Sequence, residues 1–436
     1  MQRPSGEHLS IAFVATCPPR QCGIATFSKD LEQALKTADE TVRIQWAAIN
    51  EATSIHPYGP EVRWRIRQGS PESYREAAHQ INAAAVDVVS LQHEFGLYGI
   101  WEDPFDDHLT PFLESLRKPL VTTLHSVLPD PTPSVRDSVR RIGVRSSRVV
   151  VMAERARSLL LKAYGVAPEK VCVIPHGVPA VEPRGRTRMK EHLALTDRTI
   201  ITTFGLVDPR KGLEYMIEAM QDVRRRYPEA LYLIVGKTHP ELVRYEGEAY
   251  RKRLWQQVRD LELEQHVAFV DQYLTQPQIV AYLLASDVYV TPYLDPKQVT
   301  SGTLAYALGA GKAIVSTPFP HAAEVLAGER GILVDFRSGP QLAEATLRIV
   351  GDPVLKRTLE QNAYSYGRET AWPRVGERML SILQSAASSS LESQGALAGV
   401  VEVAGAPGGW LPAPSFRPLA PASTPYDPAP AGPPGH

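Results

Sequence analysis

A turn of small and hydroxyl-bearing residues, Ser301, Gly302 and Thr303, lies between a predicted strand and a predicted helix in the segment 295–324. Backbone N–H groups at the start of a helix have no partner within the helix, and the helix dipole adds positive charge there. Such a turn would bind a phosphate or another anion. An ordinary strand–turn–helix unit without a ligand has the same pattern and is the alternative interpretation.

Two cations, Arg210 and Lys211, follow another predicted strand and precede a helix that begins near Gly212. A guanidinium and an ammonium group beside a helix start can neutralise a diphosphate. A solvated basic turn is the alternative. The diphosphate interpretation is favoured because the turn at 301–303 lies on a neighbouring strand of the same predicted domain.

Three further loops at strand ends lie in the first half of the chain. Gly23, in the loop CPPRQCGIATF, would let the backbone approach a ligand, although no GxGxxG dinucleotide motif is present. His93 and Glu94 follow one strand and either brace the loop or bind a ligand. His125 follows another strand, where it could donate to a sugar hydroxyl or a phosphate. A metal site built from these two histidines and the glutamate is disfavoured because nothing fixes its geometry.

The candidate residues are positioned by short apolar strands that alternate with helical segments. Continuous apolar runs are typical of parallel strands that are covered on both faces. The predicted strands span residues 10–15, 42–49, 86–92, 119–124, 148–153 and 170–174, and then 198–204, 230–235, 266–270, 287–292, 312–317 and 331–336. This pattern predicts two Rossmann-like, doubly wound α/β domains, whose strand ends face each other across a cleft.

Composition places the domain boundaries. We expect an N-terminal domain over residues 1–183, a polar linker over 184–198 and a C-terminal domain over 199–362. A terminal helix is expected over 363–385. Residues 386–436 are rich in proline, alanine and glycine, and they are predicted to be a disordered tail because they offer little apolar surface to bury.

Charge and cysteine content narrow the class of protein. The 436 residues carry a formal net charge of −1, which argues against a nucleic-acid binder. No secretory signal and no apolar run of membrane-spanning length is evident, although peripheral membrane contact is compatible with the sequence. Cys17, Cys22 and Cys172 form neither a CxxC pair nor a disulfide framework, so a cytoplasmic location is expected.

Several short segments between residues 10 and 385, taken together and in their order along the chain, resemble the retaining glycosyltransferases of family 4, which have the two-domain GT-B fold. The matching segments are PPRQCGIATF, SLQHEFG, TLHSV, KVCVIPHGV, FGLVDPRKG, LLASDVYVTPY and ALGAGKAIVSTP, followed by a terminal helix after ETAWPRV. The resemblance implies transfer of a hexose, of mannose or glucose type, from a nucleotide-diphosphate sugar to a glycan, lipid or small-molecule acceptor. It implies front-face displacement with retention, no metal and no other cofactor.

The resemblance also implies residue roles. Gly23, Lys211, Ser301, Gly302 and Thr303 would contact the donor phosphates, and His125 would contact the donor sugar. His93 and Glu94 would lie on the acceptor side.

Two departures from the family pattern affect the donor site. Leu206 stands where the family has an arginine, which Arg210 would replace. Gln298 and Tyr306 stand where the family has paired glutamates; Gln298 could still bind sugar hydroxyls, and Glu324 is a nearby carboxylate that would take part.

Two other functions are therefore weighed against a transferase. The missing arginine and glutamates suit a non-catalytic GT-B protein with a degenerate donor site. A GT-B phosphorylase or epimerase is disfavoured because no lysine lies in a pyridoxal-binding context. A metal-dependent GT-A transferase is disfavoured because no DxD motif ends a strand; Asp106 and Asp107 lie in a predicted loop or helix start.

Overall fold

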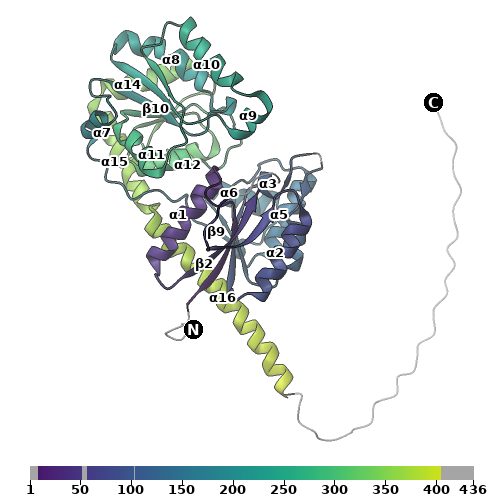
Figure 1. Cartoon of the computed structure of the whole chain (residues 1–436). Helices are drawn as coiled ribbons and strands as arrows, with labels where there is room; N and C mark the ends of the chain where they lie inside the picture. Colours follow the sequence, from purple (N-terminus) through teal and green to yellow (C-terminus); the bar gives the residue numbers. More distant parts are fainter. Residues whose placement is uncertain (1–7, 52–55, 103, 404–436) are drawn as a thin grey trace, which may run out of the picture. The chain divides into compact units, whose positions relative to one another are not determined.

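The computed structural model describes residues 8–51, 56–102 and 104–403 of the 436-residue chain. The described residues up to Ser390 form one compact unit that contains two parallel β-sheets, each with helices packed around it (Figure 1). The predicted class, two Rossmann-like α/β domains, is confirmed. Within the described parts of the chain, no helix combines the length and the apolar character that a membrane crossing requires.

The N-terminal domain has a seven-stranded parallel sheet in the order β3-β2-β1-β4-β7-β8-β9. Its strands are β1 Ser10–Ala15, β2 Arg43–Asn50, β3 Val62–Arg67, β4 Val88–His93, β7 Leu120–Leu124, β8 Arg148–Val151 and β9 Val171–Val173, with an antiparallel pair β5 Gly99–Ile100 and β6 Asp106–Asp107 beside them. Its helices are α1 Gly23–Ala38, α2 Pro71–Ala83, α3 Phe95–Tyr98, α4 Thr110–Ser115, α5 Pro133–Arg145 and α6 Glu154–Ala163.

The C-terminal domain has a six-stranded parallel sheet in the order β12-β11-β10-β13-β14-β15. Its strands are β10 Thr199–Phe204, β11 Ala230–Val235, β12 Val267–Val270, β13 Val288–Thr291, β14 Ile314–Ser316 and β15 Ile332–Leu333. The helices from the domain junction onward are α7 Arg186–His192, α8 Leu213–Arg226, α9 Pro240–Glu246, α10 Ala249–Asp260, α11 Gln276–Ala285, α12 Gly302–Gly309, α13 Pro320–Val325, α14 Gly339–Gly351, α15 Pro353–Glu369 and α16 Trp372–Val403.

The burial of the strands on both faces explains why they appear as continuous apolar runs in the sequence. All six residues of β4 are buried, as are all six of β11, because helices cover both faces of each sheet. Strand β3 was not predicted. It lies at the sheet edge, and its sequence VRWRIR alternates buried and exposed side chains, so no continuous apolar run marks it.

Two boundaries differ from those expected from sequence. The predicted linker 184–198 contains helix α7, whose Lys190 is bound to Asp287 of the C-terminal domain. The predicted terminal helix 363–385 is the end of α15 followed by α16. Helix α16 runs to Val403, so the predicted tail begins as helix, and residues 404–436 of that tail lie outside the described residues.

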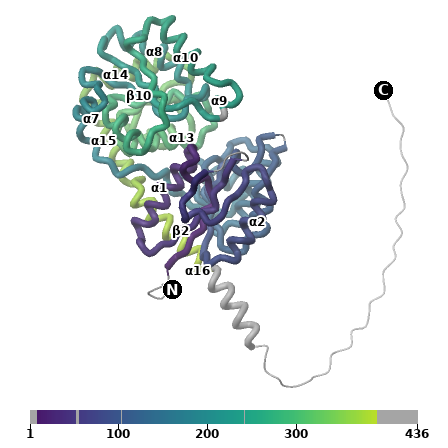
Figure 2. The backbone as a smooth tube through the Cα atoms, in the orientation of Figure 1, coloured from purple at the N-terminus to yellow at the C-terminus, as the bar shows by residue number. Residues whose placement is uncertain are grey.

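The first half of α16 packs against the N-terminal domain. Trp372, Val375, Met379 and Leu383 are buried in the same apolar cluster as Leu31 of α1 and several strand residues. Figure 2 shows α1 beside the start of α16. The chain therefore leaves the C-terminal domain through α15 and returns to cover the N-terminal sheet.

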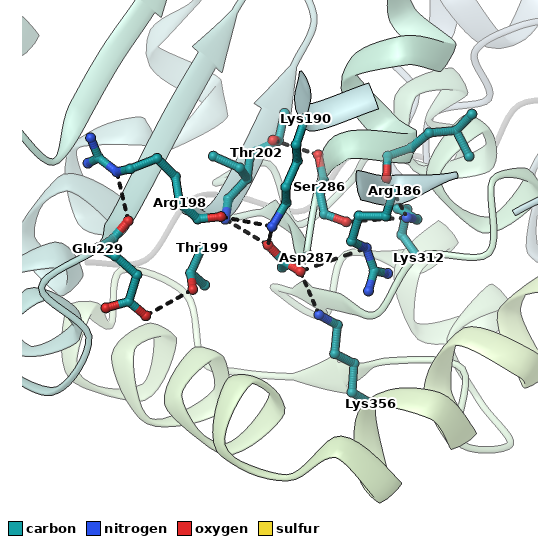
Figure 3. Close-up of polar contacts among 12 residues, drawn as sticks. Arg186, Lys190, Arg198, Thr199, Thr202, Glu229, Ser286, Asp287, Lys312 and Lys356 are labelled. Carbon is teal, nitrogen blue, oxygen red and sulfur yellow. Dashed lines mark hydrogen bonds and ion pairs between the residues drawn. The ribbon is translucent and has the colours of Figure 1, made fainter. Parts of the chain in front are cut away.

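The buried carboxylate of Asp287 links several elements of the C-terminal domain (Figure 3). Asp287 precedes β13 and binds Lys190 Nζ at 2.6 Å, Lys356 Nζ at 2.8 Å and the backbone N–H of Ile200 at 2.9 Å. Arg186 Nε lies 3.7 Å away. Burial alone would raise the pKa of Asp287, but these cations and hydrogen bonds lower it from 3.8 to about 2. One carboxylate thus joins α7, α15 and two strands.

A fully buried lysine lies beside this cluster. Lys312 precedes β14, and its ammonium group donates to the carbonyl of Ser286 at 3.2 Å. Burial, together with the charges of Arg186 and Lys356, lowers its pKa from 10.5 to about 7. The folded protein therefore binds the Lys312 proton more weakly than the unfolded chain does.

This lysine should give stability a distinct pH dependence. Between pH 7 and about 10 the unfolded chain holds the Lys312 proton and the folded protein does not, so folding becomes more favourable as pH rises. Compared with Lys312→Met, the wild type should gain up to about 1.4 kcal/mol of unfolding free energy per pH unit in that range. Urea unfolding at pH 7, 8.5 and 10 measures it. Exposed Lys252→Met is the control, and a constant gap between the wild type and Lys312→Met would contradict the assignment.

Candidate active site

A cavity of about 450 Å³ lies at the carboxyl ends of the strands of both sheets, a size typical of small-molecule sites. Seven of the residues predicted from the sequence line it: Gly23, Glu94, His125, Arg210, Lys211, Gly302 and Thr303. It is also lined by residues without a predicted role, among them Thr26, Phe27, Asp30, His176, Lys237, His239, Tyr273 and Tyr306.

The floor of the cavity includes the N-terminus of α12. The side chain of Ser301 caps this helix by accepting from the N–H of Leu304, and the backbone N–H of Ser301 donates to His321 Nδ1 at 3.0 Å. Among the described residues, the N–H groups of Gly302 and Thr303 have no protein acceptor. The predicted anion turn therefore offers two free donors, and the N–H of Ser301 is not one of them.

Glycine fits position 302 because the imidazole of His176 lies close to it. A Cβ atom there would lie 2.8 Å from Nε2 of His176, so the imidazole ring would have to shift to admit any other residue. His176 follows β9 in the N-terminal domain, and its Nδ1 donates to the carbonyl of Gly177 at 2.8 Å. The absence of a side chain at 302 thus leaves the helix N-terminus open beside this histidine.

Lys211 is held next to the same helix start. Its ammonium group lies 3.7 Å from the ring centroid of Tyr293, a cation–π contact. The hydroxyl of that tyrosine is 2.6 Å from Thr303 Oγ1. No carboxylate among the described residues pairs with Lys211, so its charge is available to an anion.

Arg210 is placed differently from Lys211. Its guanidinium donates two hydrogen bonds to Asp208, at 2.9 and 2.7 Å, and its side chain is 69% exposed. Burial would raise the pKa of Asp208, but the hydrogen bonds from Arg210 lower it. Much of the arginine charge is therefore balanced by Asp208, whereas the charge of Lys211 is not balanced by a carboxylate of the described residues.

Helix α1 forms the N-terminal wall of the cavity. Gly23, Thr26, Phe27 and Asp30 occupy positions i, i+3, i+4 and i+7, so they share one face of the helix. A Cβ atom on Gly23 would meet nothing within 4 Å. That position therefore has open space beside it, and the predicted contact of Gly23 with a ligand stays a prediction.

His125 is fixed in one protonation state. Burial and the neighbouring His176 and His93 lower its pKa to about 3, so the ring is neutral at physiological pH. Its Nε2 lies 3.0 Å from Oε1 of Gln92, which can only accept, so Nε2 carries the proton. The remaining nitrogen, Nδ1, is an acceptor. The contact of His125 with a ligand stays a prediction; with Nε2 held by Gln92, Nδ1 would accept a hydrogen bond from a ligand hydroxyl.

His93 and Glu94 separate in the structure. His93 is 1% exposed and stacks on Tyr98 with ring centroids 5.3 Å apart, so it lies behind the cavity wall. Glu94 lines the cavity, where its carboxylate accepts from Ser126 Oγ at 2.6 Å and from the N–H of Phe95. Burial raises the pKa of Glu94 despite these bonds. Among the described residues, no three histidine, cysteine, aspartate or glutamate side chains are grouped to hold a metal ion.

Two further predicted residues are not brought to the cavity. The amide of Gln298 donates to the carbonyl of Thr300 at 2.9 Å. Glu324, in α13, accepts from the N–H groups of Glu154 and Arg155 at 2.9 and 3.0 Å. It therefore caps α6, whose preceding residue Ala153 has no capping side chain.

The capping role of Glu324 predicts a stability effect. Glu324→Ala should lower the free energy of unfolding by about 1 kcal/mol, the usual cost of losing an N-cap acceptor. Glu324→Gln should cost less because one oxygen remains. Thermal unfolding compares both with Glu344→Ala, an exposed glutamate on α14. The capping role would be contradicted if Glu324→Ala had the melting temperature of the wild type. It would also be contradicted if the variant bound the nucleotide sugar more weakly while its stability stayed unchanged.

Similarity to known proteins follows the two-domain division. The model for Glycosyltransferase Family 4 matches residues 23–181, and the model for Glycosyl transferases group 1 matches residues 186–366. A GDP-mannose-dependent monoacylated alpha-(1-6)-phosphatidylinositol monomannoside mannosyltransferase from Corynebacterium glutamicum is 24% identical over 389 residues, 84% of this chain and 96% of the relative. A GDP-mannose-dependent alpha-(1-6)-phosphatidylinositol monomannoside mannosyltransferase of Mycolicibacterium smegmatis is 29% identical over 164 residues, only 40% of its length.

Solved structures share the fold at lower identity. Sucrose-phosphate synthase from Thermosynechococcus elongatus has a TM-score of 0.70 and 19% identity, covering 88% of this chain and all of that one. Anabaena HepE in complex with UDP and glucose has a TM-score of 0.66 and 16% identity, covering 87% of this chain and all of that one. Two parallel-sheet domains around a shared cavity define the GT-B class. Within that class, the chain belongs to the family 4 glycosyltransferases.

Proposed function

We propose that this enzyme transfers a hexose, of mannose or glucose type, from a nucleotide-diphosphate sugar to a glycan, lipid or small-molecule acceptor, with retention at the anomeric carbon. The observation that carries the proposal is the pairing of Lys211 with the open N-terminus of α12 across Tyr293. This arrangement collects positive charge and two free N–H groups at one point of the cavity, as a diphosphate requires.

The proposed reaction is a front-face displacement. The acceptor hydroxyl oxygen bonds to the anomeric carbon while the bond from that carbon to the diphosphate oxygen breaks. The hydroxyl proton passes to the departing oxygen, so no protein base is needed. Lys211 and the N–H groups of Gly302 and Thr303 stabilise the negative charge that builds on the leaving group, and no metal ion is invoked.

His125 positions the sugar in this scheme. Its neutral ring presents Nδ1 as an acceptor, while Gln92 holds Nε2. A hydroxyl of the transferred hexose would donate to Nδ1 and fix the sugar against the cavity wall. Of the two residues predicted on the acceptor side, Glu94 lines the cavity, and burial raises its pKa.

The donor is supported by the relatives. Both mannosyltransferases described above are GDP-mannose-dependent, and HepE binds UDP and glucose. A hexose donor is common to these cases, and the nucleotide base differs between them. We extend the proposal to a cytoplasmic location, which the three free cysteines support.

A non-catalytic sugar-nucleotide-binding protein is the second candidate. It is favoured by Leu206, Gln298 and Tyr306, which replace the arginine and glutamates of the family pattern. Incubation with UDP-, GDP- and ADP-sugars separates the candidates. A transferase should raise its melting temperature with one donor and slowly hydrolyse it, whereas a binding protein should show the shift alone. No shift and no hydrolysis with any donor would contradict the proposed transferase.

A further inference from the structure

The carboxylate of Asp30 is the acidic group on the α1 face of the cavity. Asp30 is half-buried, and one of its oxygens, Oδ2, accepts two hydrogen bonds from the C-terminal domain. Tyr306 Oη of α12 donates at 2.9 Å, and Gln276 Nε2 of α11 donates at 3.0 Å. Three helices therefore fix the orientation of this carboxylate.

The other oxygen of Asp30 has no such support. Among the residues that the structure describes, no group donates a hydrogen bond to Oδ1, and no lysine or arginine forms an ion pair with the carboxylate. Oδ1 is not among the buried atoms that lack a partner, so this oxygen is open to the cavity and can accept a hydrogen bond from a ligand. Burial raises the pKa of Asp30, although Tyr306 and Gln276 counteract it.

The chemistry of the cavity limits what can complete this site. A nucleotide-diphosphate sugar has its negative charge on the phosphates, which Lys211 and α12 attract. Its ribose and its hexose carry hydroxyl groups, which are good donors to a carboxylate. Tyr306 and Gln276 already donate to Oδ2, so substrate hydroxyls would be received at Oδ1.

We propose that Asp30 is a specificity-determining residue that accepts hydrogen bonds from hydroxyl groups of the bound nucleotide sugar, with Tyr306 and Gln276 holding its carboxylate in place. The inference rests on the proposed donor. Its distinctive feature is that α1, in the domain opposite the phosphate-binding helix, supplies the carboxylate. The hydroxyls belong either to the ribose or to the transferred hexose.

Binding measurements with Asp30→Asn test the proposal. Asparagine has nearly the same shape and can still accept from Tyr306, but it lacks the charge. Isothermal titration calorimetry is carried out with UDP, GDP, ADP and their hexose conjugates. The wild type should bind at least one nucleoside diphosphate and the nucleotide sugar made from it. Asp30→Asn should bind that nucleotide sugar about tenfold or more weakly. Asp222→Asn, a half-buried aspartate on α8 that does not line the cavity, should bind as the wild type does.

Deoxy analogues of the ligands identify which hydroxyl groups donate to Asp30. If they belong to the ribose, Asp30→Asn weakens the free nucleoside diphosphate too, and the 2′- or 3′-deoxy analogue binds weakly to the wild type but no worse to the variant. If they belong to the hexose, only the nucleotide sugar is weakened. Should Asp30→Asn not fold, Gln276→Met replaces it, because Gln276 holds the Asp30 carboxylate without lining the cavity: it should weaken the hydroxyl-bearing ligand but not its deoxy analogue, and unchanged binding would contradict the proposal.

Two results would overturn the proposal, and they are distinguishable from each other. Asp30→Asn that binds every ligand as the wild type does, or whose loss stays the same when each ribose and hexose hydroxyl is removed in turn, would overturn the role of Asp30 and leave the proposed donor intact. A wild type that binds no nucleotide sugar would contradict the proposed function and, with it, this inference.

Discussion

Replacing Lys211 with alanine is expected to weaken binding of the nucleotide-diphosphate sugar by about 1.5–3 kcal/mol, or roughly 10- to 150-fold in Kd. The ammonium group rests on the ring of Tyr293 beside the start of α12, and it has no carboxylate partner among the described residues. Alanine removes the charge but leaves the two N–H groups of the helix in place. The phosphate site should therefore be weakened without being lost.

Isothermal titration with the donor that binds the wild type measures this loss. Lys211→Arg should restore part of the affinity, because the charge remains while the shape of the donor group changes. Lys252→Ala, an exposed lysine on α10, is the matched control. Unchanged affinity in Lys211→Ala would place the diphosphate elsewhere in the cavity.

Asp287→Asn is expected to lower the free energy of unfolding by about 3–5 kcal/mol, the usual cost of removing one partner from a buried ion pair. Three cationic side chains surround Asp287, and buried Lys312 lies nearby (Figure 3). Asparagine keeps the shape but leaves these cations uncompensated. Helices α7 and α15 would lose the group that joins them to the sheet.

The pH dependence of Asp287 has a definite sign. Its pKa falls from 3.8 to about 2 on folding, so its stabilisation is present above pH 4 and is lost as pH drops toward 2. The gap between wild type and Asp287→Asn should therefore narrow below pH 4. Urea unfolding from pH 3 to pH 7, with Asp260→Asn as the surface control, measures it. A loss below 1 kcal/mol at pH 7 would contradict the central role of this carboxylate.

Sequence patterns identified most of the fold because the strands are buried on both faces. The continuous apolar runs in β4 and β11 needed no tertiary information. Strand β3 lacked such a run because it lies at the sheet edge. Helix α7 was hidden in a polar segment because Arg186 and Lys190 are held by a carboxylate about a hundred residues away.

The candidate site was predictable where it depends on local chain direction. Gly23, Lys211 and Gly302 all follow strands, and parallel strands bring such residues to one edge. Contacts between the domains carry no local signal. Asp30 and Tyr306 are 276 positions apart, and Glu324 caps a helix 170 positions earlier, so their partners could not be read from spacing.

His176 lay in a segment that supported the family resemblance, yet it was given no role. It follows the short strand β9, and its meaning depends on its closeness to Gly302. The sequence offers one signal for His176, a histidine that follows a strand. The same signal marks His125 as a candidate site residue. Burial lowers the pKa of His176 to about 4, so it too is neutral, beside the N-terminus of α12.

The most direct test of the central claim is a crystal structure with the nucleoside diphosphate or nucleotide sugar that binds best in solution. The diphosphate should lie at the start of α12, with its oxygens within hydrogen-bonding distance of the N–H groups of Gly302 and Thr303 and of the Lys211 ammonium group. A diphosphate bound away from both Lys211 and α12 would contradict the account.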